Sequence, residues 1–316
     1  MSSYVAPKWL PGGHLQTILA SLRPPPPVAK TRERWDTPDG DFIDVDWAGD
    51  AASRRLLVLF HGLEGGSDSH YARSLSAHAA AAGLRVAMPH WRGCSGEINR
   101  RPRAYHSGDS DEVDWILRKL LPSADERYAV GVSLGGNVLL KWLGERGGSA
   151  ASIVRRAAAV SAPVDVGAAG RALDRGLNRV LYTQMFLSTL KPKSLRKLEA
   201  FPGLFDAAAL ERARTFREFD DLVTAPLHGF RDADHYWSMA SSAPKLSGIR
   251  VRTLVLNARD DPFLPEADLL RSAREVSEAV LLEFPRAGGH VGFLEGPFPG
   301  RHGWLARRLL SFLLET

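Results

Sequence analysis

The sequence predicts an α/β fold with a mostly parallel central sheet, helices flanking both of its faces and an inserted helical cap. Two observations lead to this fold class. Short, continuously apolar segments such as 54–60 and 84–91 alternate with segments of helical periodicity, as buried parallel strands and their crossover helices do. A long block, from about residue 164 to residue 245, interrupts this alternation and has no convincing strand.

The first forty residues are expected to be irregular except for a short helix at 14–22, which ends before an extended proline run at 24–27. Residues 41–47 alternate apolar and polar side chains, and this pattern predicts a half-buried strand. Further strands, the last two running into polar loops, are predicted at 54–60, 84–91, 128–133, 155–163, 251–261 and 279–290. Helices are predicted at 69–83, 109–121, 135–146, 265–277 and 301–315.

The interrupting block predicts helices inserted into the α/β domain as a cap. Its segment 171–198 places a set of mainly apolar side chains near one helical face: Leu173, Leu177, Val180, Leu181, Gln184 and Leu187. Basic side chains are scattered around that face: Arg171, Arg175, Arg179, Lys191, Lys193, Arg196 and Lys197. The same pattern would also suit helices packed onto the body of the domain. We expect residues 1–40 to form an N-terminal segment on the core, and residues 41–316 to form one domain with a cap over about 164–245.

Composition and charge narrow the class of protein. The net charge of +5 is spread along 316 residues, which is too diffuse to predict nucleic-acid binding. Cys94 is the single cysteine and cannot form an intrachain disulfide, so nothing requires an oxidising compartment. No signal peptide is evident, and no apolar stretch approaches the ~20 residues of a membrane span. We expect a cytoplasmic protein, and the basic cap leaves open a peripheral contact with membranes.

The segment GVSLGG places Ser133 between a predicted strand and a predicted helix, with Gly131 and Gly135 two residues away on either side. This is the context of a nucleophile elbow, in which glycines permit a sharp turn and a close backbone approach. The helix that follows would direct backbone N–H groups at a developing oxyanion. The alternative is a serine that only caps this helix. The strand–turn–helix context favours the nucleophile.

A serine nucleophile needs a base, and the base needs a carboxylate that fixes its tautomer. His290 follows the last predicted strand and two glycines, which let its loop bend toward a neighbouring strand end. A loop histidine without a role is the alternative. Asp260 and Asp261 end the preceding strand; we favour Asp261, which Pro262 follows, and assign Asp260 to shaping the loop. The chain order Ser, Asp, His is the one expected for this fold.

The oxyanion donors are predicted to be the backbone amides of Leu134, after the serine, and Leu63, in HGLEGG after an early strand. His61 is expected to order that loop rather than to transfer protons.

Other candidates are weaker. Cys94 has no indicated base. His106 and Asp111 have the spacing of a base and its acid in some acyltransferases, but Asp111 stands at a predicted helix start and is explained as an N-cap. No metal or nucleotide-cofactor motif is found, so we expect no cofactor.

Five segments carry a family resemblance: FHGLEGGSDSHYARSL, HWRGCSGEINRRPRAYHSGDSDEVDW, GVSLGGN, NARDDPF and GGHVGFLEG. Together with the opening WLPGGHLQT, they resemble the YheT-like α/β-hydrolases, which are related to eukaryotic membrane-anchored hydrolases that act on lipids and to yeast medium-chain ester synthases. The resemblance spans nearly the whole chain and implies a serine esterase with the triad Ser133, Asp261 and His290. The family also includes enzymes that transfer an acyl group to an alcohol, so the resemblance leaves this activity open. The eukaryotic relatives' membrane anchor is not found here.

The sequence therefore predicts a serine hydrolase that cleaves carboxylic esters of short- to medium-chain acyl groups through an acyl-enzyme. The expected substrate is a small ester or a lipid. The alternatives are an acyltransferase that makes medium-chain esters, a lipase or phospholipase at a membrane surface, and a binding protein that kept the fold without activity.

Overall fold

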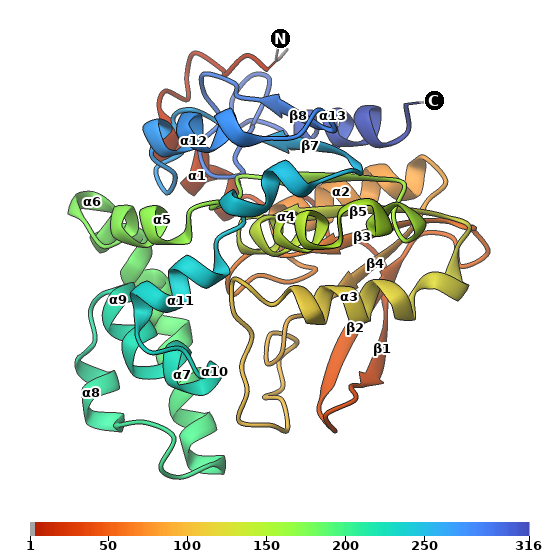
Figure 1. Cartoon of the computed structure of the whole chain (residues 1–316). Helices are drawn as coiled ribbons and strands as arrows, with labels where there is room; N and C mark the ends of the chain where they lie inside the picture. The colour runs from red at the N-terminus through yellow and green to blue at the C-terminus, as the bar shows by residue number, and fades with distance from the viewer. Residues whose placement is uncertain (1–3, 316) are drawn as a thin grey trace.

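An eight-stranded sheet forms the centre of the computed structural model, which describes residues 4–315 (Figure 1). The strand order is β1-β2-β4-β3-β5-β6-β7-β8; the pairs from β4 to β8 are parallel, and β1 and β2 join that edge antiparallel. The strands are β1 (Thr31–Asp36), β2 (Phe42–Ala48), β3 (Arg55–Phe60), β4 (Arg85–Pro89), β5 (Glu126–Val132), β6 (Arg156–Val160), β7 (Arg252–Leu256) and β8 (Val280–Glu283). The predicted fold class is confirmed.

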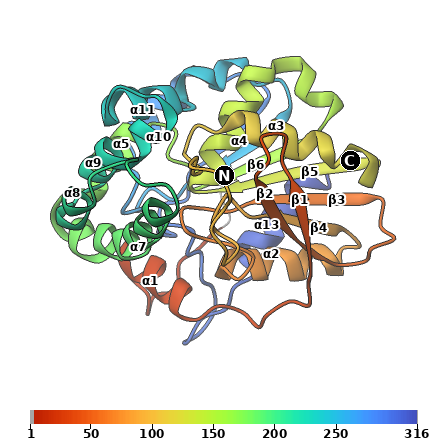
Figure 2. The same ribbon diagram turned by 90° about the horizontal axis from the view of Figure 1, so that it is seen from below.

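Helices cover both faces of the sheet (Figure 2). Helices α2 (His70–Ala81) and α13 (Trp304–Leu313) contact each other on one face, and α3 (Ser110–Lys119) and α4 (Leu134–Arg146) contact each other on the other. Each face has its own apolar core, because alternate strand residues such as Leu57 and Val58 point to opposite sides of the sheet. All four helices lie at predicted positions. Helix α12 (Glu266–Ser272), also predicted, is shorter than expected and continues into a 3₁₀ turn over 273–275.

The first two strands correct the sequence analysis. The expectation that residues 31–36 are irregular is wrong, because they form the edge strand β1. The expectation that β2 is half-buried is also wrong, since all seven of its residues are buried. Two ion pairs from β1 explain both results: Arg34 binds Asp44 through two hydrogen bonds of 2.8 and 2.9 Å, and Arg32 binds Asp46 at 2.7 and 2.9 Å. Arginine side chains thus cover the acidic residues of β2.

The block between β6 and β7 is helical, and residues 164–245, all of them described, contain no strand. It stands to one side of the sheet as a separate layer (Figure 1). Its helices are α5 (Val166–Leu173), α6 (Gly176–Asn178), α7 (Gln184–Ala200), α8 (Ala207–Arg212), α9 (Phe216–Phe219), α10 (Ala225–His228) and α11 (Ala233–Ala240), with π-helical turns at 179–183 and 220–224 and a 3₁₀ turn at 243–248. The inserted cap is confirmed.

The predicted helical face within the cap is only partly correct. Leu187 is buried, but Leu177 and Val180 are 56% and 67% exposed. The reason is that a π-helical turn at 179–183 shifts the helical register between Val180 and Leu187, and the helix also breaks between Leu173 and Gly176, so these residues do not share one face. Tyr182 and Phe186, which the pattern had omitted, face the interior instead.

The N-terminal helix α1 (Gly13–Leu22) confirms the predicted helix and packs on the loop that follows β8. Gln16 accepts a hydrogen bond from the Leu294 amide at 3.2 Å, and Tyr4 donates one to the Leu294 carbonyl at 2.7 Å. The division of the chain at residue 40 stays a prediction, and residues 1–3 of the predicted segment lie outside the described residues.

Candidate active site

Ser133 occupies the turn between β5 and α4, at the carboxyl edge of the parallel strands. Its backbone has φ +53° and ψ −121°, a conformation that a residue with a side chain adopts at a cost of about 1–3 kcal/mol. Its hydroxyl does not cap helix α4, contrary to the capping alternative, and points to His290 instead. A Cβ atom at Gly131 would lie 2.3 Å from the Gly135 carbonyl oxygen, and one at Gly135 would lie 2.4 Å from that of Phe60. Both glycines are therefore needed for the turn.

The Gly135→Ala substitution is expected to lower the free energy of unfolding by about 3 kcal/mol, because its Cβ would collide with rigid backbone. The change in urea denaturation midpoint measures this loss. Gly148→Ala is the matched control: Gly148 is exposed, has no atom within 4 Å of an added Cβ, and should change stability by less than about 0.5 kcal/mol. Equal stability of the two variants would contradict the packing argument.

Ser133, His290 and Asp261 form a hydrogen-bonded chain that links the ends of three strands. The Ser133 Oγ to His290 Nε2 distance is 3.0 Å, and His290 Nδ1 lies 2.9 Å from Asp261 Oδ2 and 3.2 Å from its Oδ1. Asp261 and His290 are only 5% and 8% exposed, so little solvent weakens this contact. Asp261 thus holds the Nδ1–H tautomer, which leaves Nε2 free to accept the serine proton.

Asp260 has a different position. It accepts a hydrogen bond from the Gly289 amide at 2.9 Å and does not contact the His290 ring, so it shapes the loop that carries the histidine. Burial raises the pKa of Asp260 above its ordinary value, and the nearby carboxylate of Asp261 adds to that rise. The structure therefore brings Asp261, rather than Asp260, to the histidine.

Three residues that the sequence analysis missed support His290. Thr17 of helix α1 accepts the His290 amide proton at 2.8 Å, and Ser161 accepts that of Val291 at 3.2 Å. The Phe263 ring stacks on the imidazole with a centroid distance of 4.0 Å. Nothing in the local sequence marks these residues, because each acts across a long separation in the chain or through an ordinary apolar contact.

The HGLEGG loop after β3 lies against the serine: a Cβ at Gly62 would be 3.0 Å from Ser133 Cβ and 3.6 Å from its Oγ. The Gly62 amide donates to Tyr71 at 2.9 Å, and the Glu64 amide donates to Tyr105 at 3.1 Å. Within residues 4–315, the Leu63 and Leu134 amides donate to no protein acceptor. Two unengaged N–H groups, one from each loop, are thus available beside Ser133.

His61 has an ordering role, as expected. Its Nδ1 donates to the Gly62 carbonyl at 2.7 Å, and its Nε2 accepts from the Trp91 amide at 3.1 Å. Complete burial lowers the pKa of His61 to about 3, so the ring stays neutral and is fully engaged in holding the loop.

The structure does not favour Cys94, His106 or Asp111 as a catalytic group. Burial raises the pKa of the Cys94 thiol to about 12, so it stays protonated near neutral pH. His106 accepts a hydrogen bond from the Gly108 amide at 3.1 Å and packs on His228, whereas Asp111 is exposed on α3. The N-cap expectation for Asp111 is wrong, because Asp109 is the N-cap and Asp111 lies in the first turn.

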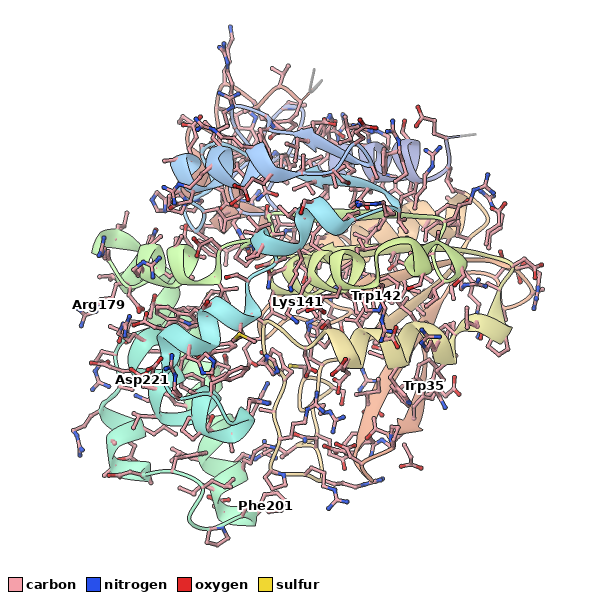
Figure 3. The ribbon with its side chains drawn as sticks, viewed as in Figure 1. Trp35, Lys141, Trp142, Arg179, Phe201 and Asp221 are labelled. Atoms are coloured by element: carbon pink, nitrogen blue, oxygen red, sulfur yellow. The ribbon has the colours of Figure 1, made fainter. Side chains whose placement is uncertain are left out.

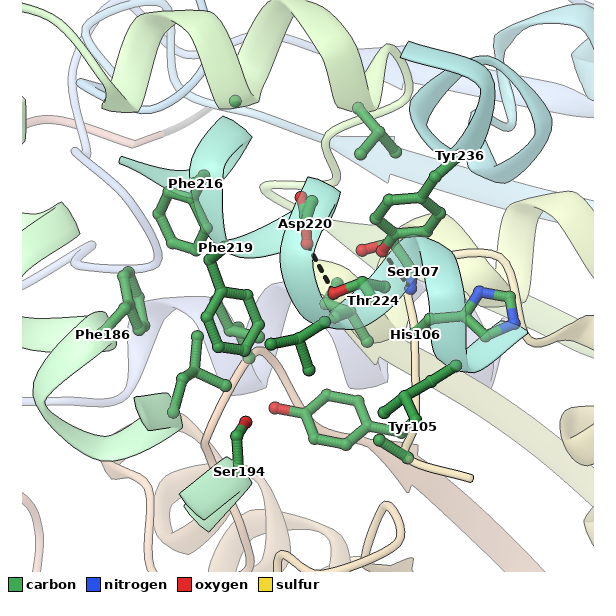
Figure 4. Close-up of a pocket in the computed structure, with 18 of the residues that line it drawn as sticks. Tyr105, His106, Ser107, Phe186, Ser194, Phe216, Phe219, Asp220, Thr224 and Tyr236 are labelled. Atoms are coloured by element: carbon green, nitrogen blue, oxygen red, sulfur yellow. Dashed lines mark hydrogen bonds between the residues drawn. The ribbon is translucent and has the colours of Figure 1, made fainter. Parts of the chain in front are cut away.

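A cavity that is partly open to solvent lies between the sheet edge and the cap. Ser133, Leu63, Leu134 and His290 all line it. Phe186, Phe216 and Phe219 form an aromatic wall from the cap, and Tyr105, His106 and Tyr236 lie across from them (Figure 4). Most of the lining is apolar, so the cavity can hold a hydrocarbon chain next to the serine.

Asp220 is an unusual carboxyl group in this lining. It accepts a hydrogen bond from Thr224 at 2.6 Å (Figure 4). It also accepts one from the Trp237 indole at 2.7 Å. Burial raises the pKa of Asp220 from 3.8 to about 7. The folded state therefore binds the proton more tightly than the unfolded state, and the stability that this proton contributes is lost as pH rises from about 4 to about 7.

The Asp220→Asn substitution is expected to remove this loss. Its amide can donate to Thr224 and its carbonyl can accept from Trp237, so both partners of Asp220 stay satisfied. Relative to wild type, the variant should be nearly unchanged at pH 4.5 and more stable by about 2–4 kcal/mol at pH 8. Urea denaturation at both pH values measures the difference, and a stability gain that is the same at both would contradict the pKa assignment.

Within residues 4–315 no group of three or more histidine, cysteine or acidic side chains is arranged to hold a metal ion. No helix among the same residues has the length and hydropathy needed to cross a bilayer.

The chain is similar to several known proteins. A family model described as alpha/beta hydrolase fold matches residues 55–297. YheT of Escherichia coli (strain K12) is 38% identical over 312 residues, covering 95% of this chain and 89% of YheT. Human phospholipase ABHD3 is 29% identical, covering 98% of this chain and 78% of that protein.

Solved structures show the same fold at low sequence identity. The esterase Pf2001 of Pyrococcus furiosus matches with a TM-score of 0.59 and 15% identity, over 92% of this chain and 98% of that one. The esterase EaEST of Exiguobacterium antarcticum matches with a TM-score of 0.58 and 17% identity, over 89% and 99% of the two chains. The similarity to YheT that the motifs indicated is confirmed.

Proposed function

The chain belongs to the alpha/beta hydrolase family, and from this we propose that it is a serine hydrolase that cleaves carboxylic esters with a short- or medium-chain acyl group. One observation carries the proposal: the hydrogen-bonded chain Ser133–His290–Asp261 stands at the wall of an apolar cavity. Relatives named phospholipase and monoacylglycerol lipase, and structural neighbours named esterase, support ester cleavage.

In the proposed reaction, Ser133 Oγ attacks the ester carbonyl carbon while His290 Nε2 takes the hydroxyl proton. The carbonyl oxygen becomes an oxyanion, and the Leu63 and Leu134 amides donate hydrogen bonds to it. The intermediate collapses, the C–O bond to the alcohol breaks, and His290 returns the proton to the departing alcohol. A water molecule, deprotonated by His290, then attacks the acyl carbon. The bond from this carbon to Ser133 Oγ breaks, His290 returns the proton to Oγ, and the carboxylic acid is released.

A fluorophosphonate probe and an ester series test the proposal. The probe should attach to Ser133, as identified by peptide mass spectrometry, because its phosphorus is attacked as an ester carbonyl would be. Among p-nitrophenyl esters from acetate to palmitate, kcat/KM should be highest for short or medium chains that fit the cavity beside Phe186 and Phe216. A folded protein that neither labels nor hydrolyses any ester would contradict the proposal and favour a binding role.

A lipid ester at a membrane surface is a second candidate, supported by the outer face of the cap. Leu177, Val180 and Met185 are each more than half exposed there. Arg175 and Arg179 flank them, and Figure 3 shows Arg179 projecting away from the body of the protein. Apolar side chains bordered by arginines suit the surface of an anionic bilayer.

Co-sedimentation with vesicles separates these two substrate classes. Binding to vesicles of mixed phosphatidylcholine and phosphatidylglycerol, lost in the Leu177→Ser/Val180→Ser variant, would favour the lipid ester. No binding to anionic vesicles would remove this candidate and leave the proposal of a small ester as it stands.

A further inference from the structure

Glu64 follows Leu63 directly and has the backbone conformation of a strained turn, with φ +53°. A side-chain-bearing residue holds this conformation only where its surroundings fix it. Here the amides on both sides of Leu63 are fixed by tyrosine hydroxyls, and the turn is closed by a 3.0 Å hydrogen bond from the Gly65 amide to the Gly62 carbonyl. The direction of the Leu63 N–H therefore depends on how firmly its neighbours are held.

The Glu64 carboxylate helps to fix the backbone next to Leu63. Its Oε1 accepts a hydrogen bond of 2.7 Å from the Tyr105 hydroxyl, which also accepts the Glu64 amide proton at 3.1 Å. Backbone and side chain of one residue are thus tied to a single buried hydroxyl group. Glu64 has a side-chain exposure of only 9%, so its negative charge needs a nearby cation.

Lys193 supplies that cation from the cap. Its Nζ lies 2.6 Å from Glu64 Oε1, and it comes from helix α7, 129 residues later in the chain. The same ammonium lies 3.5 Å from Cys94 Sγ and 5.8 Å from the centre of the Tyr105 ring. One turn further along α7, Lys197 is buried and donates to Asn99 at 2.7 Å and to two backbone carbonyls. This face of α7 is thus attached to the Glu64 loop and to the loop that contains Asn99.

We propose that Lys193 and Glu64 are positioning residues for the oxyanion site, so that the cap sets the orientation of the Leu63 amide. This inference rests on the proposed ester hydrolysis. The ion pair holds Glu64 against Tyr105, and through Glu64 it holds the peptide that carries the Leu63 N–H. It also neutralises a carboxylate one residue away from a site where negative charge develops, and an unpaired carboxylate there would oppose the oxyanion.

The test compares the rates of p-nitrophenyl butyrate hydrolysis and fluorophosphonate labelling in single and double variants. In Lys193→Met, kcat and the labelling rate constant should both fall about tenfold, with KM within about twofold, because the change acts on the transition state. Lys193→Arg should keep most of the activity. Adding Glu64→Gln to Lys193→Met should recover most of the loss, since a neutral amide still accepts the Tyr105 proton and leaves no unpaired charge.

Lys191→Met is the matched control. Lys191 lies on the same helix and donates to the backbone carbonyls of Glu211 and Ala213, both within the cap. It should leave kcat and the labelling rate unchanged. If Lys193→Met acts at wild-type rates, or if both lysine variants lose activity equally, the inference is wrong and the proposed function stands. A wild-type protein that neither labels nor hydrolyses would overturn the proposed function and this inference with it.

Discussion

Replacing Ser133 with alanine is expected to lower kcat for a p-nitrophenyl ester by roughly 10⁵- to 10⁶-fold. The loss is this large because the hydroxyl group is both the attacking atom and the hydrogen-bond partner of His290 Nε2 at 3.0 Å, and no other nucleophile takes its place. Cys94, the one thiol, is held in its protonated form by burial. The measurement is steady-state hydrolysis at enzyme concentrations high enough to detect the residual rate.

Ser188→Ala is the control for this result. Ser188 is an exposed cap residue whose hydroxyl donates to the Met185 carbonyl at 2.6 Å. It takes no part in the proposed reaction. It should keep the wild-type kcat, and both variants should keep the wild-type urea midpoint. A Ser133→Ala protein that is folded and hydrolyses the ester at more than about a hundredth of the wild-type rate would remove Ser133 as the nucleophile.

Replacing Asp261 with asparagine should lower kcat by about 10⁴-fold while the protein stays folded. The asparagine side chain fills the same space but offers an N–H₂ donor where His290 Nδ1 now finds a carboxylate oxygen at 2.9 Å. The imidazole would then adopt the other tautomer, with its proton on Nε2, and could no longer accept the Ser133 proton. The kcat of the variant should partly recover at alkaline pH, because hydroxide ion can then take the Ser133 proton in place of His290.

Asp260→Asn provides the matched comparison, because the two aspartates are neighbours with different contacts. An asparagine at 260 keeps a carbonyl oxygen for the Gly289 amide, which Asp260 now binds at 2.9 Å. We expect kcat to fall by less than about tenfold. The reverse order of effects, with Asp260→Asn the more damaging change, would assign the triad acid to Asp260.

The sequence allowed the fold and the centre of the site to be predicted because their signals are local. A strand, a turn with two glycines and a helix surround Ser133 within a short segment, and DDP and GGH each follow a buried strand. Parallel strands bring their carboxyl ends to one edge, so order along the chain was enough to expect these residues together.

The parts that could not be predicted depend on contacts between distant segments. Strand β1 has a single buried side chain, Trp35, and becomes a strand because its arginines pair with the acids of β2. The link from Lys193 to Glu64 joins residues 129 positions apart. Glu64 lies in the HGLEGG segment, but nothing in the sequence indicates Lys193 as its partner. The break after Leu173 and the π-helical turn at 179–183 divided what looked like one continuous helical face.

Helix α1 holds the loop of His290 closely enough to affect when the site is assembled. A Cβ at Gly289 would lie 2.4 Å from the Gly13 carbonyl oxygen, and one at Gly292 would lie 2.6 Å from that of Gln16. During synthesis on the ribosome, α1 is made among the first elements and the histidine loop among the last. The contacts between α1 and the histidine loop therefore form only after Ser133 and Asp261 have been made, and a nascent chain that carries these two residues but lacks His290 cannot act on an ester.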